Sequence, residues 1–129
     1  ARKEVRDWQE NAREIARQTL FTKTLLGRKR LVADMIMGRS RSGSASRAVI
    51  NTPIQGGAAD IVGMGMVKIH RNERLKELGW FMILQIHDEL ILEGPEESAE
   101  EAFKIIRECM EHPLARPLSV ALPVDGSIA

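Results

Sequence analysis

The chain of 129 residues is 43% hydrophobic and 29% charged, with a net charge of +1, which is typical of one folded domain or of a piece of a larger one. No apolar run approaches the roughly 20 residues of a membrane span, and the N-terminus lacks the apolar core of a signal peptide. The single cysteine, Cys109, excludes an internal disulfide, and we expect it to pack on a helix face.

The charges are distributed unevenly along the chain. Through Arg47 there are 12 Lys or Arg against 5 Asp or Glu, and after it there are 7 against 13. A basic half joined to an acidic half suggests a surface for a polyanion beside a surface that repels one. Uneven solvation of helix faces is the alternative explanation. The chain begins without Met inside a helical pattern, so we expect it to be a fragment of a longer protein.

The first elements that the pattern predicts are a helix, a hairpin and a loop. Apolar residues three and four apart, beginning at Val5, predict an amphipathic helix over residues 3–19. The segment FTKTLLGRKRLVA places a glycine between two runs rich in Thr, Leu and Val, which predicts a hairpin that turns near residues 27–29. Turn-forming residues and arginines in GRSRSGSAS, residues 38–46, predict a loop.

A long helical pattern follows over residues 46–78. Pro53 and the adjacent pair Gly56 and Gly57 must bend or break this helix, because proline removes a backbone donor and glycine is a poor helix former. Gly79 is a typical residue for its C-terminal end.

The last part of the chain predicts a second hairpin, a helix and a strand. WFMILQIHDELILE reads as two strands around a tight turn at or near His87 and Asp88. Residues 95–113 begin and end with proline and predict a helix, and LSVALPV, residues 118–124, predicts a final strand. Because helices and strands do not alternate regularly, we expect an α+β fold, with two hairpins and the C-terminal strand in an antiparallel sheet and helices packed on one face.

Two adjacent acids, Asp88 and Glu89, interrupt the apolar hairpin. With unbroken alternation Asp88 would share one face with Ile86, Leu90 and Leu92, where a carboxylate is costly unless the chain turns or a cation binds. Turn formation is one explanation. Binding of Mg²⁺ is the other, since this ion takes one or two carboxylates together with substrate phosphates. Adjacent strand positions do not easily aim at one ion, so a complete two-metal site needs another aspartate from elsewhere.

A second constellation lies in SRAVINTPIQGGAAD. Arg47, Asn51 and Gln55 are four residues apart and form one polar line on a helix, from which the bend at Pro53 could displace Gln55. Their side chains can donate hydrogen bonds to the base acceptors that every base pair presents in the minor groove. An ordinary solvated helix face is the alternative.

Three segments, TLLGRKR, RAVINTPIQGGAAD and LQIHDELILE, in that order and spacing, resemble the C-terminal palm segment of family A (polymerase I-like) DNA polymerases. Within the last segment, QIHDE resembles motif C. The resemblance spans almost the whole chain. The continuation RNERLKELGW to GPEESAEEA is similar to the plant and protist organellar branch, which implies a plastid or mitochondrion, with the bacterial cytoplasm as the alternative location.

The resemblance implies roles for the residues that match its motifs. Asp88 matches the aspartate that binds the catalytic metals, Glu89 its acidic neighbour with a smaller contribution, and His87 a residue that approaches the primer terminus. The positions implied to contact DNA are Arg47, Asn51 and Gln55 in the minor groove and Arg28 and Lys29 near the backbone.

The function that the resemblance implies is template-directed DNA synthesis by two-metal phosphoryl transfer, with primer-template DNA, deoxynucleoside triphosphates and two Mg²⁺ ions as partners, in replication or repair. The motif A aspartate and the fingers helix are absent from residues 1–129. We therefore expect these residues to be the C-terminal part of a palm domain that needs the rest of the polymerase chain and is inactive alone. A non-catalytic DNA-binding module that uses its basic half is the alternative.

Overall fold

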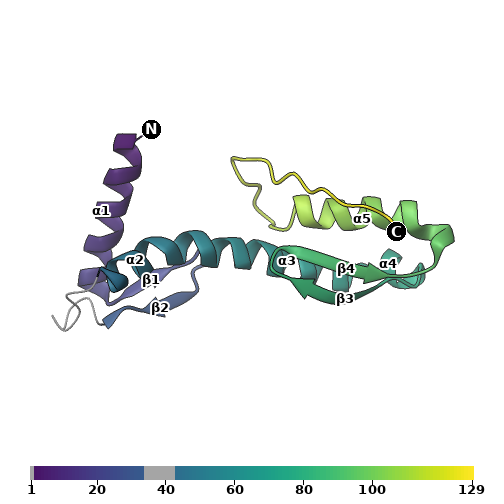
Figure 1. Ribbon diagram of the computed structural model, residues 1–129, viewed down its shortest axis with the longest axis horizontal. Coiled ribbons are helices and arrows are strands. Elements are labelled where there is room, and N and C mark those ends of the chain that lie inside the picture. Colours follow the sequence, from purple (N-terminus) through teal and green to yellow (C-terminus); the bar gives the residue numbers. More distant parts are fainter. Residues whose placement is uncertain (1, 34–42) are drawn as a thin grey trace. The chain divides into compact units, whose positions relative to one another are not determined.

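The computed structural model describes residues 2–33 and 43–129, and the chain divides into two compact units, residues 1–60 and residues 61–129 (Figure 1). The elements of the first unit are α1 (Arg2–Thr19), β1 (Phe21–Lys23), β2 (Lys29–Leu31), α2 (Ser44–Asn51) and the π-helical turn η2 (Thr52–Gly56). Helix α3 (Gly57–Arg71) follows, and the second unit continues with α4 (Glu73–Glu77), β3 (Phe81–Ile86), β4 (Glu89–Glu93), the 3₁₀ turn η3 (Glu96–Ser98) and α5 (Ala99–Glu111). Among the described residues, no helix combines the length and the apolar character needed to cross a membrane.

Helix α1 confirms the helix predicted over residues 3–19. Ala16 is fully buried and forms the core of the first unit together with Val32 and Val49. The chain leaves the helix at Leu20, whose φ of 65° is left-handed and whose N–H bonds the Ala16 carbonyl at 2.9 Å. This sharp exit lets strand β1 begin immediately after the helix.

The first hairpin is also confirmed. Its strands pair in the antiparallel register Phe21↔Leu31, Thr22↔Arg30 and Lys23↔Lys29. The turn lies in residues 24–28, where the Thr24 N–H bonds the Arg28 carbonyl at 2.9 Å and Gly27 has a φ of 85° that favours glycine. Lys29 and Arg30 therefore lie on strand β2, whereas Arg28 alone of the three consecutive bases belongs to the turn.

The predicted bend at Pro53 takes the form of η2. Because Pro53 has no N–H, it cannot bond the Val49 carbonyl four residues earlier, and the helix widens here into a π-helical turn. The Thr22 hydroxyl donates to that Val49 carbonyl at 3.2 Å. The side chain of the hairpin thus satisfies an acceptor that the proline leaves open, and this bond connects β1 to the bent helix.

Two boundaries of the long helical pattern differ from the prediction. Helix α2 begins at Ser44, so Ser44–Ser46 are helical rather than part of the predicted loop, whose residues 38–42 lie outside the described residues. The helix also breaks at Asn72, whose side chain accepts a hydrogen bond from the Leu75 N–H at 2.9 Å and caps α4. Gly79, with a φ of 76°, ends the pattern as predicted.

The second hairpin has one covered and one open face. Its strands pair in the register Phe81↔Glu93, Met82↔Leu92, Leu84↔Ile91, Gln85↔Leu90 and Ile86↔Glu89, with an irregularity between Met82 and Leu84. Leu90 and Leu92 pack against a core formed by Ile69, Leu75 and Ala102. Ile86 is 46% exposed because the turn places it opposite Glu89, so it does not share the face of Leu90 and Leu92 that unbroken alternation would have given it.

The prediction of a helix at residues 95–113 is confirmed as η3 followed by α5. Cys109 is half-buried and packs against the core of the second unit, as expected, and this burial raises the pKa of its thiol.

The α+β class, with two antiparallel hairpins and helices on one face of the second, is as predicted, but the predicted final strand is wrong. Residues 118–124 form no strand, and each hairpin is a separate two-stranded sheet rather than part of one sheet. Pro117 directly precedes this segment and Pro123 lies within it, and both lack a backbone donor. The Val124 N–H bonds the Glu111 carboxylate at 3.2 Å instead of a neighbouring strand.

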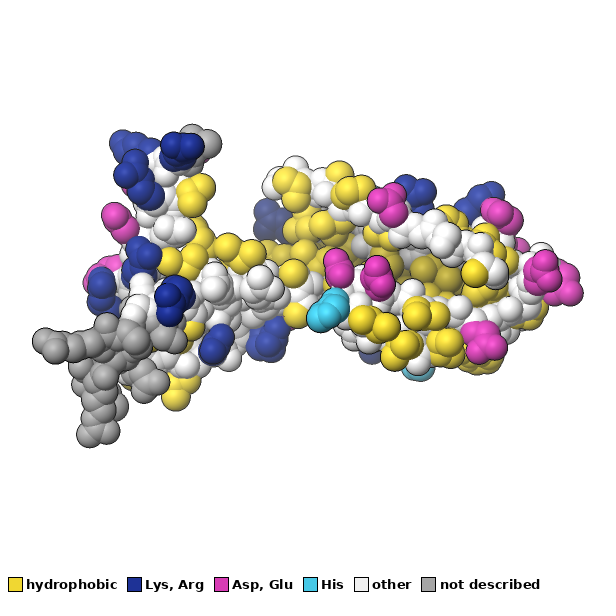
Figure 2. Space-filling view, viewed as in Figure 1, with side chains coloured by type: hydrophobic (Ala, Val, Ile, Leu, Met, Phe, Trp, Pro, Cys, Tyr) yellow, Lys and Arg dark blue, Asp and Glu magenta, His cyan; other side chains and the backbone are white. Residues whose placement is uncertain are grey.

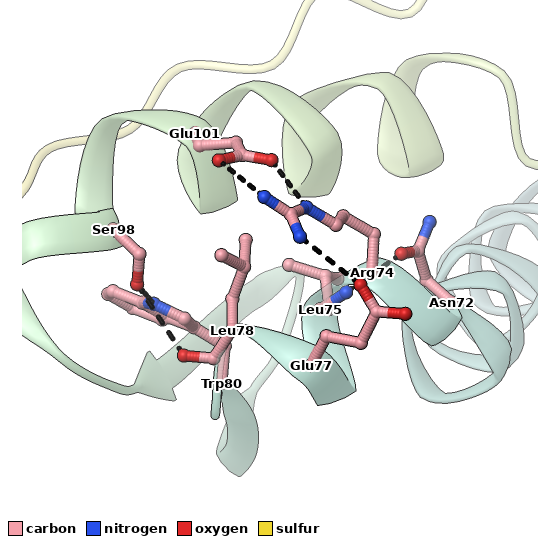
Figure 3. Close-up of polar contacts among 8 residues, drawn as sticks. All are labelled: Asn72, Arg74, Leu75, Glu77, Leu78, Trp80, Ser98 and Glu101. Atoms are coloured by element: carbon pink, nitrogen blue, oxygen red, sulfur yellow. Dashed lines mark hydrogen bonds and ion pairs between the residues drawn. The ribbon is translucent and has the colours of Figure 1, made fainter.

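Polar contacts join α4 to α5, and η3 to the start of the second hairpin (Figure 3). The Arg74 guanidinium donates to both oxygens of Glu101, from Nε at 2.6 Å and from Nη2 at 3.2 Å, and to Glu77 at 3.1 Å. The Trp80 indole N–H donates to the Ser98 hydroxyl at 2.9 Å. These bonds fix the helices that support the covered face of the hairpin.

The ion pair with Arg74 gives the second unit an acid-sensitive contact. The hydrogen bonds from Arg74 hold the pKa of Glu101 below its ordinary value. A carboxyl group whose pKa is lowered by folding stabilises the folded state above its unfolded-state pKa, and this stabilisation is lost as the pH falls through its folded-state pKa. We therefore expect Glu101→Gln to lower the thermal midpoint near pH 7 more than near pH 3. Thermal unfolding at both pH values measures the difference. Glu100→Gln, at an exposed position that forms no ion pair with another described residue, is the control, and an equal loss at both pH values would contradict the assignment.

Candidate functional site

The turn of the second hairpin places the two acids at the end of the sheet. Ile86 pairs with Glu89, so His87 and Asp88 alone form the loop, as predicted. His87 has a φ of 55°, a conformation that costs a residue with a side chain about 1 kcal/mol or more. The Gln85 amide donates to the His87 carbonyl at 3.1 Å and holds this turn. A positive φ at the first loop residue is typical of the tight turns that match the twist of hairpin strands.

Asp88 and Glu89 are both exposed, so the turn removes the cost of placing a carboxylate among apolar side chains. Two open carboxylates fit the ligand preference of Mg²⁺, which takes one or two carboxylates and keeps waters or phosphates in its other positions. Within the described ranges, no group of three or more His, Cys, Asp or Glu is close enough to hold a metal ion. These two acids therefore supply part of a metal site at most.

A pocket of about 370 Å³ lies in the first unit, beside the first hairpin and η2. Its lining residues are Thr24, Arg28, Lys29, Arg30, Asn51, Thr52, Gln55 and Gly56. Arg28, Lys29, Asn51 and Gln55 were predicted from the sequence as candidates for DNA contact, and the structure brings these four together. The bend at η2 does not separate Gln55 from Asn51, whereas the exposed Arg47 is not part of the lining.

The other lining residues were not among the predicted site residues. Arg30 donates to the Thr52 hydroxyl at 3.1 Å, which joins β2 to η2 across the pocket. Gly56 permits the close approach of the hairpin, because a Cβ at this position would lie 2.5 Å from the Thr24 methyl carbon. Arg30 belongs to a run of three bases in the sequence, but the contacts of Thr24 and Gly56 span more than 30 residues and leave no local pattern.

The charges of the two units have opposite signs. Residues 1–60 contain 12 Lys or Arg against 6 Asp or Glu, and residues 61–129 contain 7 against 12. The face shown in Figure 2 carries mainly Lys and Arg over the first unit and most of its Asp and Glu over the second. The basic pocket and the acidic turn thus belong to different units.

The sequence profile of the family described as DNA polymerase family A matches residues 1–129. The chain therefore belongs to DNA polymerase family A, which confirms the resemblance drawn from its three motifs.

Two plant proteins are among its relatives. The chain is 49% identical over 131 residues to "DNA polymerase I A, chloroplastic" of Oryza sativa subsp. japonica, a match that covers 99% of this chain and 13% of that protein. It is 48% identical over 130 residues to "DNA polymerase I B, chloroplastic/mitochondrial" of Arabidopsis thaliana, which covers 99% of this chain and 12% of that protein. The chain thus spans about one eighth of the length of these curated relatives.

A solved polymerase structure agrees with this family assignment. The chain matches the "POL domain of Pol1 from M. smegmatis complex with DNA primer-template and dNTP" with a TM-score of 0.76 and 34% sequence identity, over 91% of this chain and 20% of that one. The fold of these residues is accordingly that of a segment of a polymerase domain.

Proposed function

We propose that residues 1–129 are the C-terminal part of a palm domain in a longer protein that carries out template-directed DNA synthesis. The observation that carries this proposal is the exposed pair of acids at a tight hairpin turn in a chain that belongs to DNA polymerase family A. The similarity to a polymerase domain bound to a primer-template and a nucleotide supports the same substrates, primer-template DNA and deoxynucleoside triphosphates, for the parent protein.

In this proposal the second hairpin carries the chemistry. Asp88 holds a divalent metal through its carboxylate, Glu89 adds negative charge beside it, and His87 lies where the primer 3′ end arrives. The chemistry supplied by two Mg²⁺ ions bound there would be activation of the primer hydroxyl and stabilisation of the leaving pyrophosphate. A second aspartate from the rest of the parent chain completes the ligand set. The stiff two-residue turn keeps the Asp88 carboxylate in position, because neither strand end can move without breaking the pairing of Ile86 with Glu89.

The first unit binds the duplex in this proposal. Asn51 and Gln55 donate amide hydrogen bonds to base acceptors in the minor groove, which senses the shape of a base pair without reading its sequence. Arg47 contributes a further donor from α2. The basic residues around the turn, Arg28 and Lys29 among them, lie beside the DNA backbone. Because such contacts strengthen only for a correctly paired primer end, they contribute to fidelity as well as affinity.

In this proposal the parent protein lies in a plastid or a mitochondrion, where it acts in replication or repair. Plant relatives named as chloroplastic or mitochondrial are 47–49% identical to the chain. Bacterial relatives match as well, for example the thermostable "DNA polymerase I" of Thermus aquaticus at 42% identity over 123 residues, so a bacterial cytoplasm is the alternative.

We expect Gln55→Ala to weaken the affinity of the parent protein for a primer-template by about two- to tenfold, the effect of one or two lost hydrogen bonds, and to raise its error rate. Arg47→Ala should act in the same direction. Titration with a labelled primer-template and sequencing of the products measure both quantities. Gln18→Ala removes an exposed amide from α1 that bonds Glu14 at 3.0 Å and serves as the matched control. Unchanged affinity and error rate for Gln55→Ala would contradict its role in the minor groove.

Primer extension by the parent protein tests the function itself. With a primer-template, all four deoxynucleotides and Mg²⁺, the parent protein should lengthen the primer, whereas residues 1–129 alone should not. A parent protein that binds the duplex but never extends the primer, with any divalent metal, would instead support the alternative of a non-catalytic DNA-binding module.

A further inference from the structure

Asp60 connects the turn of the first hairpin to the start of α3. One carboxylate oxygen, Oδ1, accepts hydrogen bonds from Arg28 Nε at 3.1 Å and from Arg28 Nη2 at 2.8 Å. The other oxygen, Oδ2, lies 3.4 Å from the Leu26 N–H. The Asp60 side chain is 9% exposed, whereas that of Arg28 is 61% exposed. A nearly buried carboxylate thus holds a largely exposed guanidinium and the backbone of the turn at once.

The ionised form of Asp60 is favoured by its surroundings. A hydrogen bond with the Thr24 side chain and the hydrogen bonds from Arg28 lower the pKa of its carboxyl. Its negative charge is therefore present throughout the neutral range, and it offsets the positive charge of Arg28 at short distance.

The other two bases of the pocket have neutral partners. Arg30 donates to the Thr52 hydroxyl at 3.1 Å, and the Lys29 ammonium lies 5.6 Å from the centre of the Phe21 ring. Neither Lys29 nor Arg30 forms an ion pair with another described residue, and both line the pocket with Asn51 and Gln55. Among the described residues, Arg28 is thus paired with a carboxylate, whereas its neighbours Lys29 and Arg30 are not.

We propose that Asp60 is a positioning residue that holds Arg28 in place to stabilise the hairpin turn. Lys29 and Arg30 supply the charge that binds the phosphate backbone of nucleic acid at this pocket. The inference rests on the proposed function in one respect, that the ligand is duplex DNA. It assigns opposite roles to neighbouring bases that the sequence alone does not distinguish.

The dependence of duplex binding on salt separates these roles, since each phosphate neutralised by a protein cation contributes about 0.9 to the slope of log K against log salt concentration. The experiment measures this slope for the full parent protein with a primer-template of fixed length. Lys29→Gln removes one binding charge, so its slope should be shallower by about 0.9. Asp60→Asn keeps the size and the acceptor oxygen of the side chain but frees the charge of Arg28, so its slope should be steeper by about 0.9, which is about a 3.5-fold change over a fourfold range of salt.

The double variant Asp60→Asn with Arg28→Gln is the decisive control, because it removes a pair without net charge and should restore the wild-type slope. Arg107→Gln, which removes an exposed base on α5 that pairs with Glu111, should leave the slope unchanged. If Asp60→Asn weakens binding without a steeper slope, Asp60 is merely structural and the proposal fails. If the double variant has a shallower slope than wild type, Arg28 itself binds phosphate and the proposal also fails. A wild-type protein that binds no primer-template at all would instead contradict the proposed function.

Discussion

Asp88→Asn should abolish primer extension by the parent protein while its affinity for a primer-template stays within about twofold of wild type. Removing a charged metal ligand costs several kcal/mol of transition-state stabilisation, which corresponds to a loss of about a thousandfold or more in the rate of nucleotide addition. Affinity should survive because Asp88 is exposed at a turn and is a repulsive charge for DNA rather than a contact. Rapid-quench measurement of single nucleotide addition gives the rate, and equilibrium titration gives the affinity.

Glu93→Gln is the matched control for this experiment. Glu93 is an exposed acid at the far end of β4, where it pairs with Phe81, so its neutralisation changes the charge of the same hairpin away from the turn. We expect nearly wild-type extension from it. An Asp88→Asn protein that still turns over would refute the role of Asp88 as a metal ligand.

Gly94→Ala should destabilise the second unit by about 1–3 kcal/mol, the usual cost of overfilling a packed site. A Cβ at this position would lie 2.4 to 2.5 Å from three atoms of the Trp80 indole. The ring cannot easily move away, because its N–H is bonded to Ser98 at 2.9 Å and its body packs against the core. Relief of the clash therefore has to come from the backbone between β4 and η3, which loosens the hairpin that carries Asp88.

Amide hydrogen exchange in the parent protein measures this effect locally. We expect faster exchange in β3 and β4 of the Gly94→Ala protein, by about tenfold for each 1.4 kcal/mol of lost stability. Gly63→Ala is the control, since a Cβ there meets no atom within 4 Å and alanine favours a helix over glycine. Exchange in β3 and β4 that is equal in the two variants would show that Trp80 does not restrict this position.

The acidic turn could be predicted from the sequence because its determinants are local. Two apolar runs flank His87 and Asp88, and a carboxylate that alternation would place among apolar side chains has to lie at a turn. The end of α1 at Thr19 and the end of the helical pattern before Gly79 follow from equally local signals, a change of periodicity and a glycine, which has a positive φ in the structure. The roles of Asp88, Glu89 and His87 in catalysis go beyond this turn and stay predictions.

Other features depend on contacts that no local pattern records. Residues 118–124 alternate like a strand, but a strand needs a partner, and the segment pairs with neither hairpin in the structure. The break at Asn72 was missed because asparagine is tolerated inside a helix and caps one only when its side chain finds a free N–H. The link between Asp60 and Arg28 joins positions 32 residues apart, so the sequence around Arg28 does not show that its charge is paired with a carboxylate.

The most direct test compares rate and affinity in two variants of the parent protein, Asp88→Asn and Gln55→Ala, under the same conditions. If the second hairpin carries the chemistry and the first unit binds the duplex, Asp88→Asn loses nucleotide addition and keeps its affinity, whereas Gln55→Ala loses affinity and keeps most of its rate at saturating DNA. Equal losses of rate and affinity in both variants, or no loss of rate in Asp88→Asn, would contradict the assignment of these two functions to separate parts of the chain.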